Sequence, residues 1–170
     1  MFLIIATVSL AQTRQEQERA DYIKLVWDTN LPDDLHEFYN QDKIGSIYEI
    51  NKDLNPFYLR GDFDGDKVMD YALAIVEIKT KKKGIIIYHP KSRKDFLLGA
   101  GKNIPEGYNR DDMGWMDAWK VYDRKDVEVG VGETKKVKLI GEAILAYKLE
   151  SSSGLIYWDG KEYKWYQQGD

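Results

Sequence analysis

The sequence predicts an α+β protein with one or two N-terminal helices packed on a mainly antiparallel β-sheet. Apolar residues recur at helical spacing up to Asn40, whereas beyond it short apolar runs alternate with polar turns. No helical segment separates these runs. Consecutive strands are therefore expected to pair with each other and to run antiparallel.

Length and composition indicate one folded unit. The chain has 170 residues, 43% of them hydrophobic and 32% charged, which is typical of a globular domain rather than a disordered chain. No segment has the composition of a linker, so residues 12–170 are expected to form a single domain.

Charge and residue usage exclude several classes of function. The net charge is −4 and no concentrated basic face is evident, so no nucleic-acid partner is expected. The basic cluster at 79–83 is assigned to a hairpin loop. Without cysteine the chain can form neither disulfides nor thiolate metal sites, and with only His36 and His89 it cannot form a multi-histidine metal site. A Ser-His-Asp triad has little support.

The first segment is interpreted as a truncated signal peptide. Residues 1–11 are apolar and uncharged, and the small residues Ser9 and Ala11 precede an expected cleavage before Gln12. The segment is too short to span a bilayer, and it lacks a positive n-region, so the true start is expected upstream. The alternative is a buried N-terminal strand. Export predicts a periplasmic or secreted protein with no transmembrane segment.

Two helices are predicted before the strands. The first covers 15–28, where apolar side chains share one face; the second covers 31–39. Pro32 followed by Asp33 and Asp34 suits the first turn of the second helix. The apolar positions are Ala20, Ile23, Val26 and Trp27, and then Leu31, Leu35, Phe38 and Tyr39.

The remaining apolar runs are predicted to be strands. A hairpin over 154–166 has the strongest signal, because Asp159-Gly160 suits a type I′ turn between aromatic-rich strands. The predicted strands are 46–50, 57–61, 71–78, 84–88, 96–98, 118–122, 127–131, 137–140, 143–149, 155–158 and 163–166.

An acidic loop at 62–70 is the clearest functional signal. Aspartates occupy its positions one, three, five and nine, as Asp62, Asp64, Asp66 and Asp70, directly before an apolar strand. Calcium takes six to eight oxygen ligands, and carboxylates this close repel one another without a cation. A structural cation site is favoured; an acidic turn without an ion and a catalytic metal site are the alternatives.

The segment DFDGDKVMDYALAIV resembles the calcium loop of FG-GAP and VCBS-type repeats. The resemblance covers about residues 58–76, in a single copy. It implies a structural Ca²⁺ that fixes a turn between two strands. The implied ligands are Asp62, Asp64, Asp66, the carbonyl of Val68, and Asp70.

One position departs from that family. Its usual glycine at loop position six is replaced by Lys67, which costs about 1 kcal/mol in a left-handed conformation and adds a positive charge. This change either weakens the site, or Gly65 takes up the strain while the lysine points into solvent. An EF-hand is excluded, because it requires a glycine where Lys67 stands and a glutamate where Leu73 stands.

The long segment 99–119 is the second candidate region. Its acidic and aromatic residues form a candidate surface for a partner or ligand: Tyr108, Asp111, Asp112, Trp115, Asp117 and Trp119. Alternatively, Trp115, Met116 and Trp119 plug the core beneath the loop, which is the favoured interpretation.

Three further assignments are structural. Glu142 and Glu150 are taken as surface charges on the sheet, as are Asp159 and Glu162. His89, before Pro90, is taken as a turn residue.

These features predict an exported, non-enzymatic binding or interaction protein. Its calcium-type loop is structural, its partner is an envelope protein or glycan, and an inhibitor or immunity-type protein fits this description. The alternative is an envelope hydrolase that acts on polysaccharide or peptide through the acidic residues of loop 108–119. Oligomeric state is not predicted.

Overall fold

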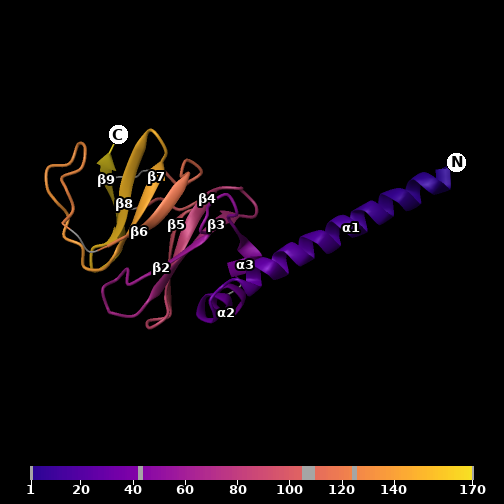
Figure 1. Cartoon of the computed structure of the whole chain (residues 1–170), viewed down its shortest axis with the longest axis horizontal. Coiled ribbons are helices and arrows are strands. Elements are labelled where there is room, and N and C mark those ends of the chain that lie inside the picture. Colours follow the sequence, from indigo (N-terminus) through magenta and orange to yellow (C-terminus); the bar gives the residue numbers. More distant parts are fainter. Residues whose placement is uncertain (1, 42–43, 105–109, 124–125, 170) are drawn as a thin grey trace. The chain divides into compact units, whose positions relative to one another are not determined.

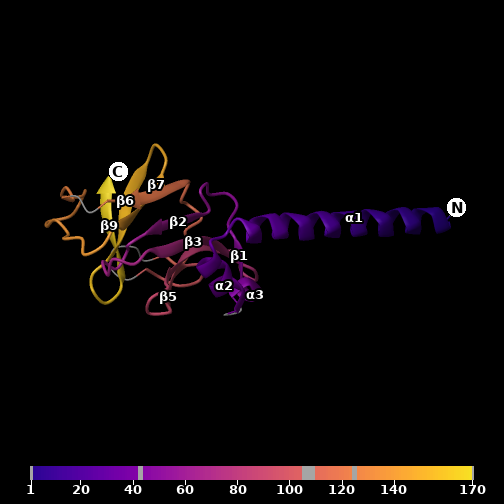
Figure 2. The same cartoon turned by 60° about the horizontal axis from the view of Figure 1, so that its bottom comes forward.

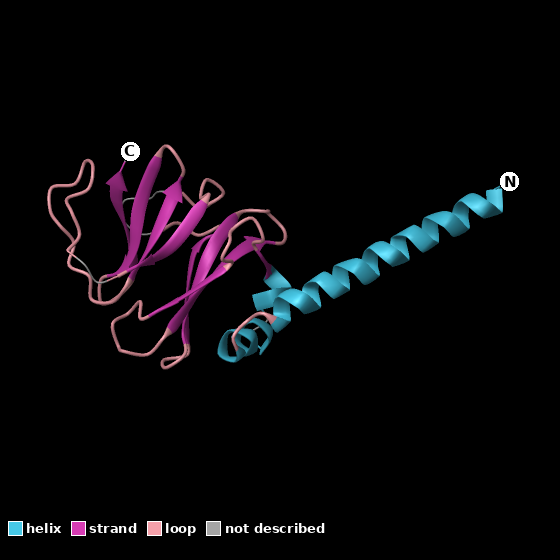
Figure 3. Cartoon of the chain, in the orientation of Figure 1, coloured by secondary structure: helices cyan, strands magenta, loops and turns pink. Residues whose placement is uncertain are grey.

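The computed structural model describes residues 2–41, 44–104, 110–123 and 126–169. The chain forms two compact units, Met1–Gln41 and Asp42–Asp170. The first is helical and the second consists mainly of strands, as Figure 3 shows. Helices combined with antiparallel strands agree with the predicted class, and the packing of helices on a sheet stays a prediction. Among the described helices, none combines the length and hydropathy needed to cross a bilayer.

The helical unit contains α1 (Phe2–Thr29) and α2 (Asp33–Gln41). The first helix begins well before the predicted residue 15 and continues through the expected cleavage position. It ends just before Leu31-Pro32, where proline disfavours helical geometry in the preceding residue. Thr29 and Asn30 donate side-chain hydrogen bonds to carbonyls of the last turn. The N–H of His36 donates to the Pro32 carbonyl, which closes the first turn of α2.

The second unit begins with the short α3 (Ile44–Ile47), where the sequence predicts a strand from residue 46. The first sheet follows (Figure 1), and all of its strand pairs are antiparallel. Strands β1 and β2 both pair with β3, which is followed by β4 and β5 in sequence order. The strands are β1 (Tyr48–Ile50), β2 (Tyr58–Gly61), β3 (Asp70–Glu77), β4 (Lys83–His89) and β5 (Lys94–Gly99).

The second sheet is a four-stranded antiparallel meander in the order β6-β7-β8-β9. Its strands are β6 (Ala118–Tyr122), β7 (Ala143–Lys148), β8 (Ser152–Trp158) and β9 (Tyr163–Gly169). The predicted hairpin between the last two strands is confirmed, but the type I′ turn is wrong. Trp158 pairs with Tyr163, so the loop has four residues, and the Asp159 carboxylate accepts the N–H groups of Lys161 and Glu162.

Two predicted strands, 127–131 and 137–140, are irregular in the structure. Val127, Val137 and Leu139 nevertheless contribute to a hydrophobic cluster with side chains of the second sheet. The Tyr166 hydroxyl accepts the N–H of Gly130 and donates to the carbonyl of Lys135. The alternation of apolar and polar residues in these two segments therefore arises because one side of the loop is buried against the sheet. Such alternation does not require that the segment pairs with another strand.

One core joins the two sheets. Neighbouring inner-face positions of the first sheet, such as Ala72 and Ile87, belong to the same cluster as Ile144 and Ile156 of the second. All four side chains are fully buried. Figures 1 and 2 show the sheets side by side in both views. The sheets therefore stabilise each other, and residues from one can complete a site on the other.

Candidate cation site

The acidic loop connects β2 to β3 as a hairpin turn. Gly61 and Asp70 are the last paired residues of the two strands, so residues 62–69 form the turn. Asp62 and Asp70 lie at its two ends, and both are buried. The predicted position of the loop between two strands is therefore confirmed.

The loop backbone takes the left-handed conformation twice. Gly65 has φ +82° and Lys67 has φ +70°. Lys67 is exposed, so its charge is solvated while its backbone has the geometry that favours glycine. Both residues take the left-handed conformation, so the glycine at position 65 does not remove the backbone strain at Lys67.

Three carboxylates of the loop converge. Ligand oxygens of Asp62, Asp64 and Asp66 lie within 4.8 Å of one another. Two oxygens that each lie about 2.3–2.6 Å from one calcium ion are separated by at most about 5 Å. The donor set and its spacing therefore fit a hard divalent cation.

The carboxylates of Asp64, Asp66 and Asp70 also hold the loop backbone. Asp70 Oδ2 accepts the N–H groups of Phe63 and Asp64, at 2.9 and 3.3 Å. Asp64 Oδ1 accepts the N–H of Asp66 at 3.0 Å, and Asp66 Oδ1 accepts that of Val68 at 2.8 Å. Each of these carboxylates thus uses one oxygen to hold the backbone, and this preorganises the loop.

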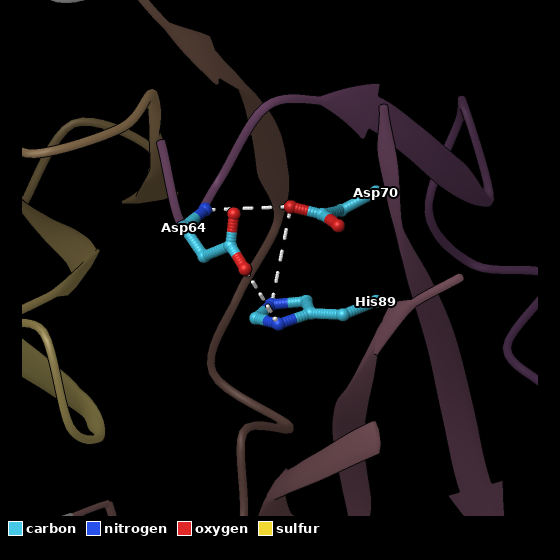
Figure 4. A group of neighbouring side chains, drawn as sticks. All are labelled: Asp64, Asp70 and His89. Carbon is cyan, nitrogen blue, oxygen red and sulfur yellow. Dashed lines mark hydrogen bonds and ion pairs between the residues drawn. The ribbon is translucent and has the colours of Figure 1, made fainter. Parts of the chain in front are cut away.

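His89 joins this cluster, which the sequence analysis missed. It is the last residue of β4 and is only 3% exposed, so its assignment to a turn is wrong. Its Nδ1 lies 3.2 Å from Asp64 Oδ2, and its Nε2 lies 3.9 Å from Asp70 Oδ2. Figure 4 shows the three side chains directed toward one another. Ligand atoms of these three residues also lie within 4.8 Å of one another, so they form a second group that could hold a metal.

A hydrogen bond ties His89 to the second sheet. Its Nε2 lies 2.6 Å from the hydroxyl of Tyr163, and the rings of Phe96 and Trp158 pack around it. His89 therefore links the acidic loop to the aromatic part of the core.

Burial shifts the pKa values of Asp70, His89 and Tyr163. Burial, reinforced by the Asp64 charge, raises the pKa of Asp70 to about 7. Burial lowers the pKa of His89 and raises that of the Tyr163 hydroxyl. Without a cation, the buried cluster thus favours a protonated Asp70 and a neutral His89 at mildly acidic pH. A bound divalent ion would instead favour the carboxylate form of Asp70.

Lys91 and Glu142 also contact the acidic loop. The Lys91 ammonium lies 3.0 Å from Asp66 Oδ2. Although partial desolvation acts in the opposite direction, the Val68 N–H and Lys91 hold the pKa of Asp66 below its usual value. Glu142 Oε2 accepts the N–H of Asp62 at 2.7 Å, while the N–H of Glu142 donates to the Asp62 carbonyl at 2.7 Å. Glu142, assigned to the sheet surface from sequence, therefore clamps the loop.

The carboxylates of the second candidate region are used structurally. Asp111 pairs with Lys82, and Asp117 Oδ2 accepts the N–H of Leu149. Asp112 Oδ1 accepts the N–H groups of Lys83 and Gly114.

The large apolar residues of that region divide into two groups. Met116 and Trp119 are buried in the core, and the Trp119 Nε1–H donates to the Pro56 carbonyl. Trp115 is half-buried and also lines a pocket. Tyr108 lies outside the described residues. Met116 and Trp119 therefore fill the core beneath the loop, as the favoured interpretation expects. Trp115 packs against the core on one side and lines a pocket on the other.

No family model, no curated protein and no solved structure matches this chain.

Proposed function

We propose that this protein is an exported, non-enzymatic binding module whose acidic loop holds a structural Ca²⁺. The observation that carries the cation proposal is the convergence of the Asp62, Asp64 and Asp66 carboxylates at the turn between β2 and β3. Asp70 and the carbonyl of Val68 complete the proposed ligand set. The ion would neutralise the carboxylates and hold the hairpin in shape.

Oxygen donors favour calcium as the ion. The proposed ligands are carboxylates and one carbonyl, which suit a hard cation rather than a soft transition metal. His89 lies within hydrogen-bonding distance of the Tyr163 hydroxyl and of Asp64. We therefore assign it a role in positioning Asp64 and Asp70 beside the ion, not a role as a ligand.

The structural use of the other carboxylates argues against a role for them in acid–base catalysis. Asp111, Asp112 and Asp117 each hold a backbone N–H or a lysine. A general acid–base pair needs carboxylates free to exchange protons with substrate. The alternative of a hydrolase that acts through the acidic residues of loop 108–119 therefore stays a prediction, and no contact of the described residues of this loop favours it.

Export and an envelope partner are parts of the same proposal. The apolar segment 1–11, followed by a charged stretch, supports a leader peptide. An inhibitor or immunity-type role in the periplasm or outside the cell suits an acidic module that has no cysteine.

The cation proposal is tested by thermal unfolding of the full chain in calcium and in EGTA. Calcium is expected to raise the melting temperature, because an ion that binds only the folded loop stabilises it by mass action. Asp64→Ala should abolish this difference. Asp95→Ala, which removes an exposed carboxylate from β5, should keep it. Identical melting curves for the unmodified protein in the two buffers would contradict the proposal.

A further inference from the structure

A pocket of about 420 Å³ is lined by described residues between β5 and β6. Pockets that bind small molecules typically measure roughly 300–1,000 Å³. The size therefore suits an organic ligand rather than a single ion. The described residues that line it, none of which belongs to the acidic loop, are Asn103, Arg110, Asp111, Asp112, Gly114 and Trp115.

Contacts within the protein hold the walls of this pocket. The indole of Trp115 meets that of Trp165 edge to face, with centroids 5.6 Å apart and planes at 89°. Asp112 is fixed by the two N–H groups that its Oδ1 accepts, and Asp111 by the ion pair with Lys82. The aromatic and acidic side chains are thus positioned before any ligand arrives, which lowers the entropic cost of binding.

The pocket is lined by side chains of both charges, and this disfavours a strongly charged ligand. Arg110 is exposed and forms no ion pair or hydrogen bond with another described residue. An anion attracted to Arg110 would also face the carboxylates of Asp111 and Asp112, and a cation attracted to those would face Arg110. Since Lys82 already balances Asp111, the remaining charges nearly cancel. A neutral ligand with several hydroxyl groups avoids both conflicts.

An indole beside polar groups suits a sugar ring. Trp115 provides a flat apolar surface with little conformational freedom to lose. Asn103 and Arg110 can donate hydrogen bonds, and carboxylate oxygens of Asp111 and Asp112 can accept them. A purely apolar ligand would instead displace water from these polar side chains without replacing its hydrogen bonds, which costs free energy.

We propose that this pocket binds a short neutral saccharide, with Trp115 packed on a pyranose ring and Arg110 hydrogen-bonded to its hydroxyls. The inference rests on the proposed function as a binding module and names a glycan as its partner. It does not depend on the cation site.

Nuclear magnetic resonance of the ¹⁵N-labelled full chain tests this assignment. The probes are maltose, cellobiose, lactose and N,N′-diacetylchitobiose, titrated in separate samples with calcium and with EGTA. The indole N–H signal of Trp115, identified by its loss in Trp115→Phe, is expected to shift in a saturable manner with at least one sugar. Glycerol at equal concentration should not reproduce the shift.

Variants separate binding from folding. Trp115→Ala is expected to weaken binding at least about tenfold, as truncation of an aromatic anchor typically does. Arg110→Gln should also weaken binding, and it removes no hydrogen bond or ion pair between described residues, so it should fold normally. Arg93→Gln, an exposed arginine in the turn after β4, is the matched control and should bind as the unmodified protein does.

Two results would overturn the saccharide assignment: no saturable shift with any probe, or binding that Trp115→Ala and Arg110→Gln both leave unchanged. Calcium-dependent melting together with no sugar binding would reject only this inference. Sugar binding without any effect of calcium on melting would reject only the cation proposal.

Discussion

Lys67 combines an unfavourable backbone with a charge of the wrong sign for a cation loop. Its φ of +70° lies in the left-handed region, where a side chain is strained. Its ammonium adds positive charge to a turn whose three neighbouring carboxylates converge. The backbone strain and the positive charge both belong to Lys67. Substitutions at this position can therefore remove the charge alone, or the charge and the strain together.

Lys67→Gly is expected to tighten calcium binding and to raise the free energy of unfolding by up to about 1 kcal/mol, because left-handed strain is relieved. The greater freedom of glycine in the unfolded chain offsets part of this gain. Lys67→Gln removes the charge and keeps the strain, so it should tighten calcium binding alone. Calorimetric titration and chemical denaturation measure the two effects. Weaker calcium binding by both variants would contradict this account.

Asp70 is the residue whose proton affinity is most useful as a probe. Its folded pKa of about 7 lies above the usual carboxyl value. Its protonated form therefore stabilises the calcium-free fold at low pH, and this contribution is lost as the pH rises from about 4 through about 7. The loss amounts to at most about 1.4 kcal/mol for each pH unit in that window. His89, whose pKa is lowered, has the opposite trend and loses stability as the pH falls below its unfolded value.

Asp70→Asn is therefore expected to become progressively more stable than the unmodified protein as the pH rises from about 4 to about 7 in EGTA. His89 is present in both proteins, so its titration enters the difference only through its contact with Asp70. Denaturation curves at several pH values measure it. With calcium the order should reverse, since the ion binds the carboxylate form. A difference that does not vary with pH in EGTA would rule out the raised pKa.

At the scale of elements, the acidic hairpin depends on a residue next to β7. Glu142 accepts one backbone hydrogen bond from Asp62 and returns another through its own N–H. Gly61, beside this contact, leaves room for the Glu142 carboxylate, because an added Cβ would lie 2.8 Å from Oε2. The turn between β2 and β3 is thus held by a segment 80 positions away in the chain.

Glu142→Ala is expected to lower the free energy of unfolding by about 1–3 kcal/mol, because it leaves the Asp62 N–H without its acceptor. Glu142→Gln keeps an acceptor oxygen and should lose less. Glu128→Ala removes an exposed side chain whose ion pair with Lys136 contributes little, and serves as the control. If chemical denaturation places Glu142→Ala and Glu128→Ala at the same stability, the clamp has no energetic role.

At the scale of the whole molecule, the two sheets of the second unit share one core. Side chains from β3 and β4 lie in the same cluster as those from β7, β8 and β9. A core common to both sheets predicts one cooperative transition for this unit rather than independent unfolding of each sheet.

Ile85→Ala in the first sheet and Ile156→Ala in the second are each expected to cost about 2–5 kcal/mol, because both side chains are fully buried. Each substitution should lower the protection of amide protons in both sheets. Hydrogen exchange followed by nuclear magnetic resonance measures this. Loss of protection confined to the substituted sheet would show that the sheets unfold separately.

Local patterns were sufficient to predict most elements of this protein. Short apolar runs predicted all nine strands that the described chain contains, because backbone pairing and one-sided burial leave a clear periodicity. The same patterns also predicted two strands over 127–140 that are not formed. Alternation shows that one side of a segment is buried, but only the tertiary structure shows whether a loop or a strand buries it.

The candidate site divides in the same way. Three aspartates at fixed spacing lie in one turn and a fourth begins the next strand, so the sequence alone was sufficient to predict the acidic loop and its place between two strands. His89, Glu142 and Tyr163 come from distant positions and have no local signal, because their roles arise when β4, β7 and β9 pack around the turn. The sequence thus determined that Asp62, Asp64 and Asp66 lie in one turn, where their carboxylates converge. The packing of the two sheets brought His89 to Asp64 and Asp70 and shifted the pKa values of Asp70 and His89, since burial and neighbouring charge act through space.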